Sequence, residues 1–164
     1  MATKVTFNYE KYHTVGYDSG TVAVKPALTT SARLYVIHNE TTNYKVYVGT
    51  ATDVKDRFKG RIDVCRELGF SQEQMDAISF FVVQIKIDDT PAPPDKYGYS
   101  QGIDVERLLI RTYMQKIGWS VRNSVKTEQF QNGTGSTLKW ELVNKAGIIN
   151  FGTHNYSLTH GSSL

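Results

Sequence analysis

The sequence contains a single cysteine, Cys65, among its 164 residues. One thiol excludes an internal disulfide and a zinc site built from several cysteines, and it is compatible with a reducing compartment. The chain also lacks an apolar run of the roughly 18–20 residues that a membrane helix needs, and its first residues lead into no apolar signal core. These absences predict a cytoplasmic protein with no membrane-embedded part.

The chain has only a small excess of positive charge. Lysine and arginine number 19 against 16 aspartates and glutamates, which gives a formal net charge of +3. This bias is well short of the basic excess that is typical of a passive nucleic-acid coat protein, so charge alone does not indicate a nucleic-acid partner. The length, with a hydrophobic share of 40%, predicts one compact domain over residues 1–164.

Two β-hairpins are predicted in the first fifty residues. Residues 12–25 place an Asp-Ser-Gly turn between two β-prone runs, and residues 33–39 and 44–50 flank a polar link. Period-two alternation puts Tyr35 and Tyr47 on one face of the second hairpin. The valines and leucine that alternate with them can be buried on the opposite face.

Helices, a third strand and a long loop are predicted to follow. Thr52 or Asp53 can cap a first helix that ends at Leu68, before Gly69. The later elements are a short helix over 71–78, a strand over 79–87, a loop over 88–102, a helix over 103–118, a segment of mixed character over 137–151 and a frayed end over about the last dozen residues.

A carboxylate interrupts the apolar face of the predicted helix over 103–118. Glu106 shares that face with Leu109, Ile110 and Tyr113. An isolated buried charge is costly, so such a group needs a partner, a metal or a raised pKa. Glu106 is therefore a candidate site residue.

Five residues follow the predicted hairpin, helix, strand and helix in an order that resembles the GIY-YIG nuclease family. The family's first motif is present as RLY at 33–35, and its second as YVG at 47–49. Arg57, ten residues after the second tyrosine, matches the helix arginine of the family, and Glu106 and Asn123 match its metal-binding glutamate and its asparagine. The full set is Tyr35, Tyr47, Arg57, Glu106 and Asn123.

The resemblance covers residues 32–123 and leaves 1–31 and 124–164 as extensions. It implies an α/β fold of the α+β type, with a small, mainly antiparallel central sheet flanked by helices. It also implies a DNA endonuclease whose Glu106 binds magnesium, with manganese as an expected substitute. We expect double-stranded DNA as the partner, because the family acts mostly on duplexes, and the extensions would add DNA contacts, specificity or a dimer surface.

Hydrolysis of a phosphodiester needs an activated water and stabilisation of the charge on the phosphate. Arg57 suits a bidentate phosphate contact, and the resemblance implies that both tyrosines contribute without deciding which one is the base. The further candidates for phosphate contact are Lys45, Arg61, Arg122 and Lys126. Arg61 stands where the family usually has histidine or tyrosine, and an arginine does not act as a base at neutral pH.

Each of these residues also has a purely structural interpretation. Arg57 and Glu106 can form an ion pair between helices, the two tyrosines can be cross-strand packing partners, and Asn123 can be a turn residue. A catalytically inactive nucleic-acid-binding module on the same scaffold is therefore the main alternative function, and a protein-interaction domain is the third.

The biological role stays open within the nuclease class. A restriction enzyme, a mobile-element nuclease and a toxin domain delivered into the cytoplasm of a target cell all fit the sequence, and a toxin would be paired with an inhibitor protein. One active site cuts one strand at a time, so a double-strand break requires a homodimer or two successive nicks.

Overall fold

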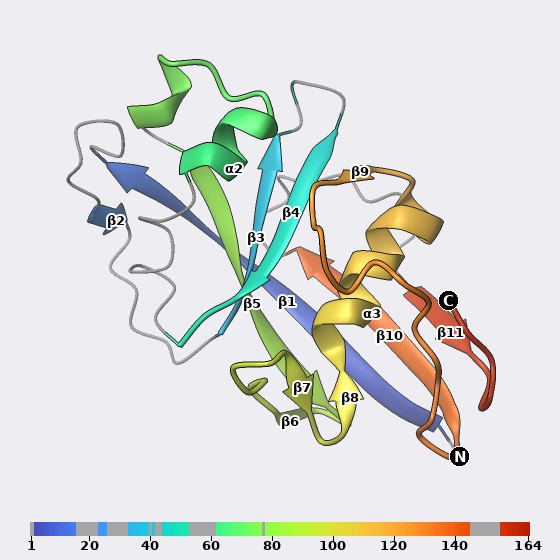
Figure 1. Cartoon of the computed structure of the whole chain (residues 1–164). Helices are drawn as coiled ribbons and strands as arrows, with labels where there is room; N and C mark the ends of the chain where they lie inside the picture. Colours follow the sequence, from blue (N-terminus) through green and yellow to red (C-terminus); the bar gives the residue numbers. More distant parts are fainter. Residues whose placement is uncertain are drawn as a thin grey trace.

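The computed structural model of the chain is dominated by one curled, mixed β-sheet (Figure 1). It describes residues 2–15, 23–25, 33–39, 41, 44–52, 62–76, 78–144 and 155–164. The strands are β1 (Ala2–Val15), β2 (Ala23–Lys25), β3 (Leu34–Asn39), β4 (Lys45–Thr50), β5 (Ser79–Ile87), β6 (Thr90–Pro91), β7 (Tyr99–Ser100), β8 (Ile103–Asp104), β9 (Ser120–Val121), β10 (Thr137–Asn144) and β11 (Asn155–Leu158). The helical elements in the described ranges are α2 (Ile62–Glu67), the 3₁₀ turn η1 (Gln74–Asp76), α3 (Val105–Thr112) and the π-helical turn η2 (Tyr113–Ile117).

The predicted fold class is wrong. The main sheet runs in the order β11-β10-β1-β5-β3-β4-β9, with β2 and β6 paired at its margins, and two of its pairs, β1 with β10 and β4 with β9, are parallel. Over the residues that the structure describes, α2 and α3 are the only α-helices. The protein is therefore mostly sheet, in place of a small antiparallel sheet flanked by helices.

The difference arises from the two segments that the resemblance leaves as extensions. β1 pairs with β5 on one side and with β10 on the other, so both ends of the chain enter the central sheet. Alternate residues of β1, including Val5 and Phe7, are fully buried, and Trp140 from β10 packs in the same hydrophobic cluster. Burial of these side chains makes the terminal segments part of the core.

The predicted hairpins and the third strand are confirmed where the structure describes them. β1 pairs with β2, with His13 opposite Lys25, although the turn between them lies outside the described residues. β3 and β4 are antiparallel with Leu34 opposite Thr50, and β5 spans 79–87 as predicted. These strands were accessible to prediction because their alternation is local.

Both faces of the sheet are covered around β3 and β4. On one face, Val36 and Val48 pack with the buried side chains of α3. On the other face, Tyr35 packs with Cys65 from α2 and Met75 from η1. The pleat thus sorts successive residues of the central strands between two separate hydrophobic clusters.

The helices differ from the predictions mainly at their ends. Gly69, with φ of +89°, ends α2, as predicted, while the start of that helix lies outside the described residues. Ser71 and Gln74 form a capping box, with hydrogen bonds of 2.8 and 3.3 Å, but the segment predicted as a short helix makes only a single 3₁₀ turn. α3 begins after β8, where Asp104 Oδ1 accepts a hydrogen bond from the backbone N–H of Arg107 at 3.1 Å.

Two segments predicted to be irregular contain paired backbone. The loop over 88–102 includes β6 and β7, which pair with β5 and β8. The C-terminal end is not frayed, because β11 pairs with β10 and the backbones of Phe130 and Leu164 exchange two hydrogen bonds of 2.7 Å. No helix in the described ranges has the length and apolar character to cross a membrane.

A chain of buried hydrogen bonds connects β1, β3 and η2 on the face of the sheet that α3 covers. The hydroxyl of Tyr113 lies 2.7 Å from the hydroxyl of Tyr9 and 2.8 Å from Nε2 of His38. Desolvation by burial lowers the pKa of His38 to about 3. The imidazole is therefore neutral at physiological pH, and its hydrogen bond satisfies a polar group within the core.

We predict that His38 makes the stability of the fold depend on pH. The unfolded histidine titrates near 6.5 and the folded one near 3, so the unfolded chain binds more protons between these values. The free energy of unfolding should therefore fall as the pH is lowered through this window, by up to about 1.4 kcal/mol per pH unit. Urea denaturation from pH 7 to pH 5, compared with His38→Gln, measures this contribution; equal slopes in both proteins would contradict it.

Candidate functional site

The two predicted tyrosines lie together on the α2 face of the β3–β4 hairpin. Tyr35 is fully buried and lies directly opposite Gly49 in the register of the two strands. Tyr47 is partly buried, and its ring centroid is 6.2 Å from that of Tyr35, at an interplanar angle of 43°. The geometry is that of a packed aromatic pair with one partner reaching the surface.

Gly49 makes room for the hydroxyl end of Tyr35. A Cβ atom at residue 49 would lie 2.5 Å from both Cζ and the hydroxyl oxygen of Tyr35. Real Cβ atoms do not approach other atoms so closely, so only glycine fits opposite this tyrosine. This contact explains the glycine of the YVG motif sterically. Without a side chain at residue 49, the ring of Tyr35 can lie across β4.

The two residues that follow β9 contact neighbouring elements: Arg122 contacts α2, and Asn123 contacts β4. The backbone N–H of Val48 donates to Oδ1 of Asn123 at 3.0 Å, and Nδ2 of Asn123 donates to the carbonyl of Val48 at 2.6 Å. Arg122 forms an ion pair with Glu67 at the end of α2. The hydrogen bond to Glu67 is the main cause that raises the pKa of Arg122, with a smaller contribution from nearby Tyr47.

Asn123 thus has a visible structural role, since its amide continues the parallel ladder of β4 and β9. Lys45, at the start of β4, pairs with Ser120 of β9 and shares the strand face of Tyr47. Arg122 is 43% exposed, which leaves it accessible to a phosphate at the edge of the sheet beside Tyr47.

Glu106 is buried on the opposite face of the sheet, at the first turn of α3. Its Oε2 accepts a hydrogen bond from Thr50 Oγ1 at 3.2 Å and lies 3.3 Å from the ammonium of Lys126. Gly98 closes over it, because a Cβ there would lie 2.5 Å from Oε2. Burial raises the pKa of Glu106, and the positive charge of Lys126 opposes that rise.

Lys126 joins two carboxylates and a loop. Its ammonium lies 3.0 Å from Oδ1 of Asp104, donates to the carbonyl of Tyr97, and sits 5.0 Å from the ring centroid of Tyr99. The backbone of Lys126 has φ of +61°, an uncommon value for a residue with a side chain, and only 18% of the side chain is exposed. Lys126 therefore contacts a phosphate only if this network opens.

The structure divides the predicted set between two faces. Tyr35 and Tyr47 belong to the α2 face, and Glu106 belongs to the α3 face, because Thr50, its partner, alternates with Gly49 along β4. Residues from both faces nevertheless contact the C-terminal end of β4, because Tyr35 lies against Gly49 and Glu106 is hydrogen-bonded to Thr50. Arg57 and Arg61 lie outside the described residues.

The carboxylates at the start of α3 are chemically suited to a hard cation. In the described ranges no three histidine, cysteine, aspartate or glutamate side chains gather as a metal site. Oxygens of Asp104 and Glu106 nevertheless converge on one cationic atom, the ammonium of Lys126. Carboxylate oxygens are the ligands that magnesium prefers, with water completing its shell, so these two residues would hold it in place of the ammonium.

Sequence reasoning missed two members of this cluster. Asp104, which caps α3 at the backbone N–H of Arg107, was not among the predicted site residues, and Lys126 was predicted to contact phosphate and not these carboxylates. The two-residue spacing of Asp104 and Glu106 at a predicted helix start is the signal that could have identified the carboxylate pair. Comparison with protein-family models, curated proteins and solved structures gave no match.

We predict that Gly49→Ala destabilises the fold by about 1–3 kcal/mol, the usual cost of overpacking a core. The added methyl group would collide with the ring of Tyr35. Gly133→Ala is the matched control, since a Cβ at residue 133 meets nothing within 4 Å. Denaturant unfolding measures both variants, and Gly49→Ala should cost less stability when it is combined with Tyr35→Leu than when it is made alone. Equal unfolding free energies for the two alanine variants would refute the steric role of Gly49.

Proposed function

We propose that the chain is a metal-dependent endonuclease of the GIY-YIG type that hydrolyses DNA phosphodiester bonds. The order of its tyrosines, arginine, glutamate and asparagine supports this function. The observation that carries it is the packing of Tyr35 against Gly49 with Tyr47 beside it, because it gives both family motifs one joint geometry. The segment that contains Arg57 leads into α2, which packs on the same face.

The end of β4 is where a scissile phosphate would bind. Gly49 there contacts Tyr35 on one face, and Thr50 contacts Glu106 on the other. A phosphate at this end of the strand can approach residues from both faces. Arg57 would neutralise its charge, and Tyr47, the member of the tyrosine pair that reaches the surface, would orient or deprotonate the attacking water while Tyr35 packs against the Tyr47 ring.

Glu106, with Asp104, would hold magnesium or, as a substitute, manganese. When bound, such a cation supplies positive charge for the transition state and lowers the pKa of its water. Lys126 contributes the positive charge at these carboxylates in the structure. Occupation by a divalent cation therefore requires the ammonium to move away or to share its carboxylates.

We propose double-stranded DNA as the partner and the cytoplasm as the place of action, either in the producing cell or in a target cell. The exposed guanidinium of Arg122 supports a phosphate contact beside Tyr47. With one active site per chain, double-strand cleavage requires a homodimer or two nicks. Restriction predicts discrete fragments, whereas a toxin, with its inhibitor protein, predicts degradation with little sequence preference.

A second candidate is a nucleic-acid-binding module without catalytic activity. The specific observation in its favour is the position of Lys126, which neutralises Glu106 from 3.3 Å and is itself mostly buried. An internal ammonium that never leaves would keep a metal from this carboxylate. Such a module would bind DNA with a steep dependence on salt and would cut nothing.

We predict that the wild-type protein nicks supercoiled plasmid with magnesium and not with chelator. Glu106→Gln should lower the cleavage rate at least a hundredfold by removing the carboxylate charge, and Tyr47→Phe should do the same by removing the hydroxyl. Tyr44→Phe is the control, since Tyr44 is 55% exposed, belongs to the same hairpin and packs near Trp119. It should retain wild-type activity.

The outcomes separate the two candidates. Loss of cutting in Glu106→Gln and Tyr47→Phe, with unchanged unfolding midpoints, supports the nuclease. Cutting that does not need metal, or cutting that both variants retain, would contradict the assignment of Glu106 and Tyr47 to the active site. Salt-sensitive DNA binding without cutting by the wild type would favour the binding module.

A further inference from the structure

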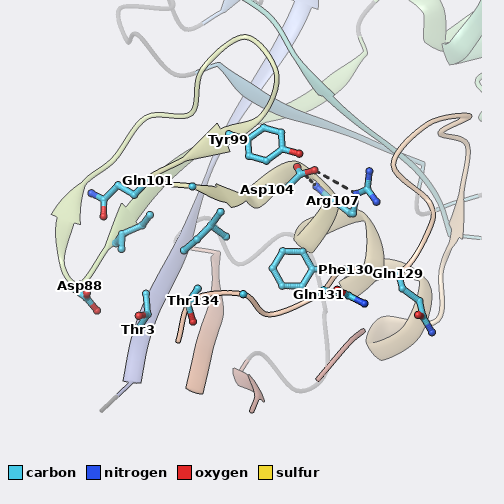
Figure 2. Close-up of a pocket in the computed structure, with 14 residues that line it drawn as sticks. Thr3, Asp88, Tyr99, Gln101, Asp104, Arg107, Gln129, Phe130, Gln131 and Thr134 are labelled. Atoms are coloured by element: carbon cyan, nitrogen blue, oxygen red, sulfur yellow. Dashed lines mark hydrogen bonds and ion pairs between the residues drawn. The ribbon is translucent and has the colours of Figure 1, made fainter. Parts of the chain in front are cut away.

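A pocket of about 780 Å³ lies beside the carboxylate cluster, between the loop of β7–β8 and the segment that precedes β10 (Figure 2). Figure 2 shows Tyr99 and Asp104 on one side of it, and Phe130 and Gln131 across from them. The volume is in the range of small-molecule sites. Neither the proposed cleavage site nor the fold accounts for this pocket.

Asp104 connects the pocket to the proposed cation site. One of its oxygens, Oδ1, faces Lys126, while the side chain also lines the pocket. The other oxygen, Oδ2, is buried and forms an ion pair with Nε of Arg107 at 3.4 Å, but neither atom has a hydrogen-bond partner among the residues that the structure describes. An ion pair of this length leaves both buried atoms without a hydrogen bond, which is costly, so a ligand that reaches Oδ2 and donates a hydrogen bond would satisfy the carboxylate.

The aromatic and amide side chains of the pocket suit a flat, polar ligand. Tyr99 is 43% exposed and offers a ring for stacking, and Phe130 is buried in the wall. Gln129 and Gln131 add amides that can both donate and accept hydrogen bonds. These features match how proteins bind an unstacked base: stacking on an aromatic ring and hydrogen bonds to its polar edge.

The charges of the pocket exclude an anionic group as its preferred ligand. Its charged lining residues are two aspartates, Asp88 and Asp104, and one arginine, Arg107, which also pairs with Glu128 at 3.8 Å. A phosphate or carboxylate would meet a net negative wall. A neutral ring that bears hydrogen-bond donors would meet an acceptor.

We propose that this pocket binds a nucleobase with an exocyclic amino group, which stacks on Tyr99 and donates a hydrogen bond to Oδ2 of Asp104. The proposal rests on the proposed function for its substrate class, nucleic acid. Adenine, cytosine and guanine have the required donor. Thymine has only a ring N–H flanked by two carbonyl oxygens, which the carboxylate repels, so the pocket discriminates against it.

Titration with free deoxynucleosides, in chelator and followed by amide NMR shifts of the ¹⁵N-labelled chain, tests the proposal. Deoxyguanosine, deoxycytidine or deoxyadenosine should shift pocket resonances, with thymidine at least tenfold weaker and deoxyribose without effect. Tyr99→Ala should weaken binding about tenfold. The matched control is Tyr97→Ala on the same loop, which removes a more exposed ring, 64% against 43%, that does not line the pocket.

Asp104→Asn tests the hydrogen bond itself. Asparagine also caps helices, so α3 should be preserved, while loss of the negative charge should narrow the gap between thymidine and the other nucleosides. Absence of nucleoside binding, equal affinity for thymidine, or equal losses in the Tyr97 and Tyr99 variants would overturn the proposal.

The source of the base is tested with a duplex that contains one 2-aminopurine, again in chelator. A rise in its fluorescence that Tyr99→Ala removes would assign the pocket to a base extruded from DNA, because the probe brightens when unstacked. Nucleoside binding without that rise would assign it to a free nucleoside. Neither measurement needs cleavage, so a protein that binds nucleosides but cuts no plasmid would fail the proposed function and retain the pocket.

Discussion

The alternation of side chains along β4 determines where the candidate site residues of this protein lie. Because the sheet is covered on both faces here, each residue of the strand belongs to one of two separate surroundings. Gly49 admits the ring of Tyr35 on one face, and Thr50 hydrogen-bonds to Glu106 on the other. One peptide unit therefore joins the tyrosine pair to the carboxylate cluster, and a slip of one residue would exchange their surroundings.

The carboxylate cluster depends on charge balance. Asp104 and Glu106 are both mostly buried, and two such carboxylates near each other need a cation. Lys126 provides it from a distant part of the sequence and holds the loop at Tyr97 at the same time. Removal of the ammonium without replacement would leave uncompensated negative charge, so the geometry of this loop and the occupant of the cluster are coupled.

The parts of the fold that sequence predicted are those whose signal is local. The alternation in residues 33–39, 44–50 and 79–87 identifies three strands, and the apolar face that includes Glu106 identifies α3 and the burial of its carboxylate. The central position of β1 was not predictable in this way. Its parallel pairing, with Ala2 opposite Thr137, joins the two ends of the chain, and no local pattern encodes such a partner.

The candidate site shows the same limit. The motif tyrosines and Gly49 were found from sequence because they lie on neighbouring strands of one hairpin. Lys126 was assigned to phosphate because a lysine in a polar, turn-rich segment gives no sign of an internal partner; its left-handed backbone and contact with Glu106 are visible only in three dimensions. Asn123 was predicted as a site residue from the resemblance, with a turn as its structural alternative, and neither interpretation anticipated that its amide pairs with the backbone of Val48.

Asp104 gives the proposed pocket and the proposed cation site a common element. Its two oxygens face different neighbours, Lys126 on one side and Arg107, which also lines the pocket, on the other. A hydrogen bond donated to Oδ2 by a bound base would draw electron density from the carboxylate and so weaken its hold on any cation at Oδ1. Thermodynamic reciprocity then requires the cation to weaken base binding by the same factor. If the proposed function holds, base recognition and cation binding would thus be coupled through the side chain of Asp104, without a movement of the fold.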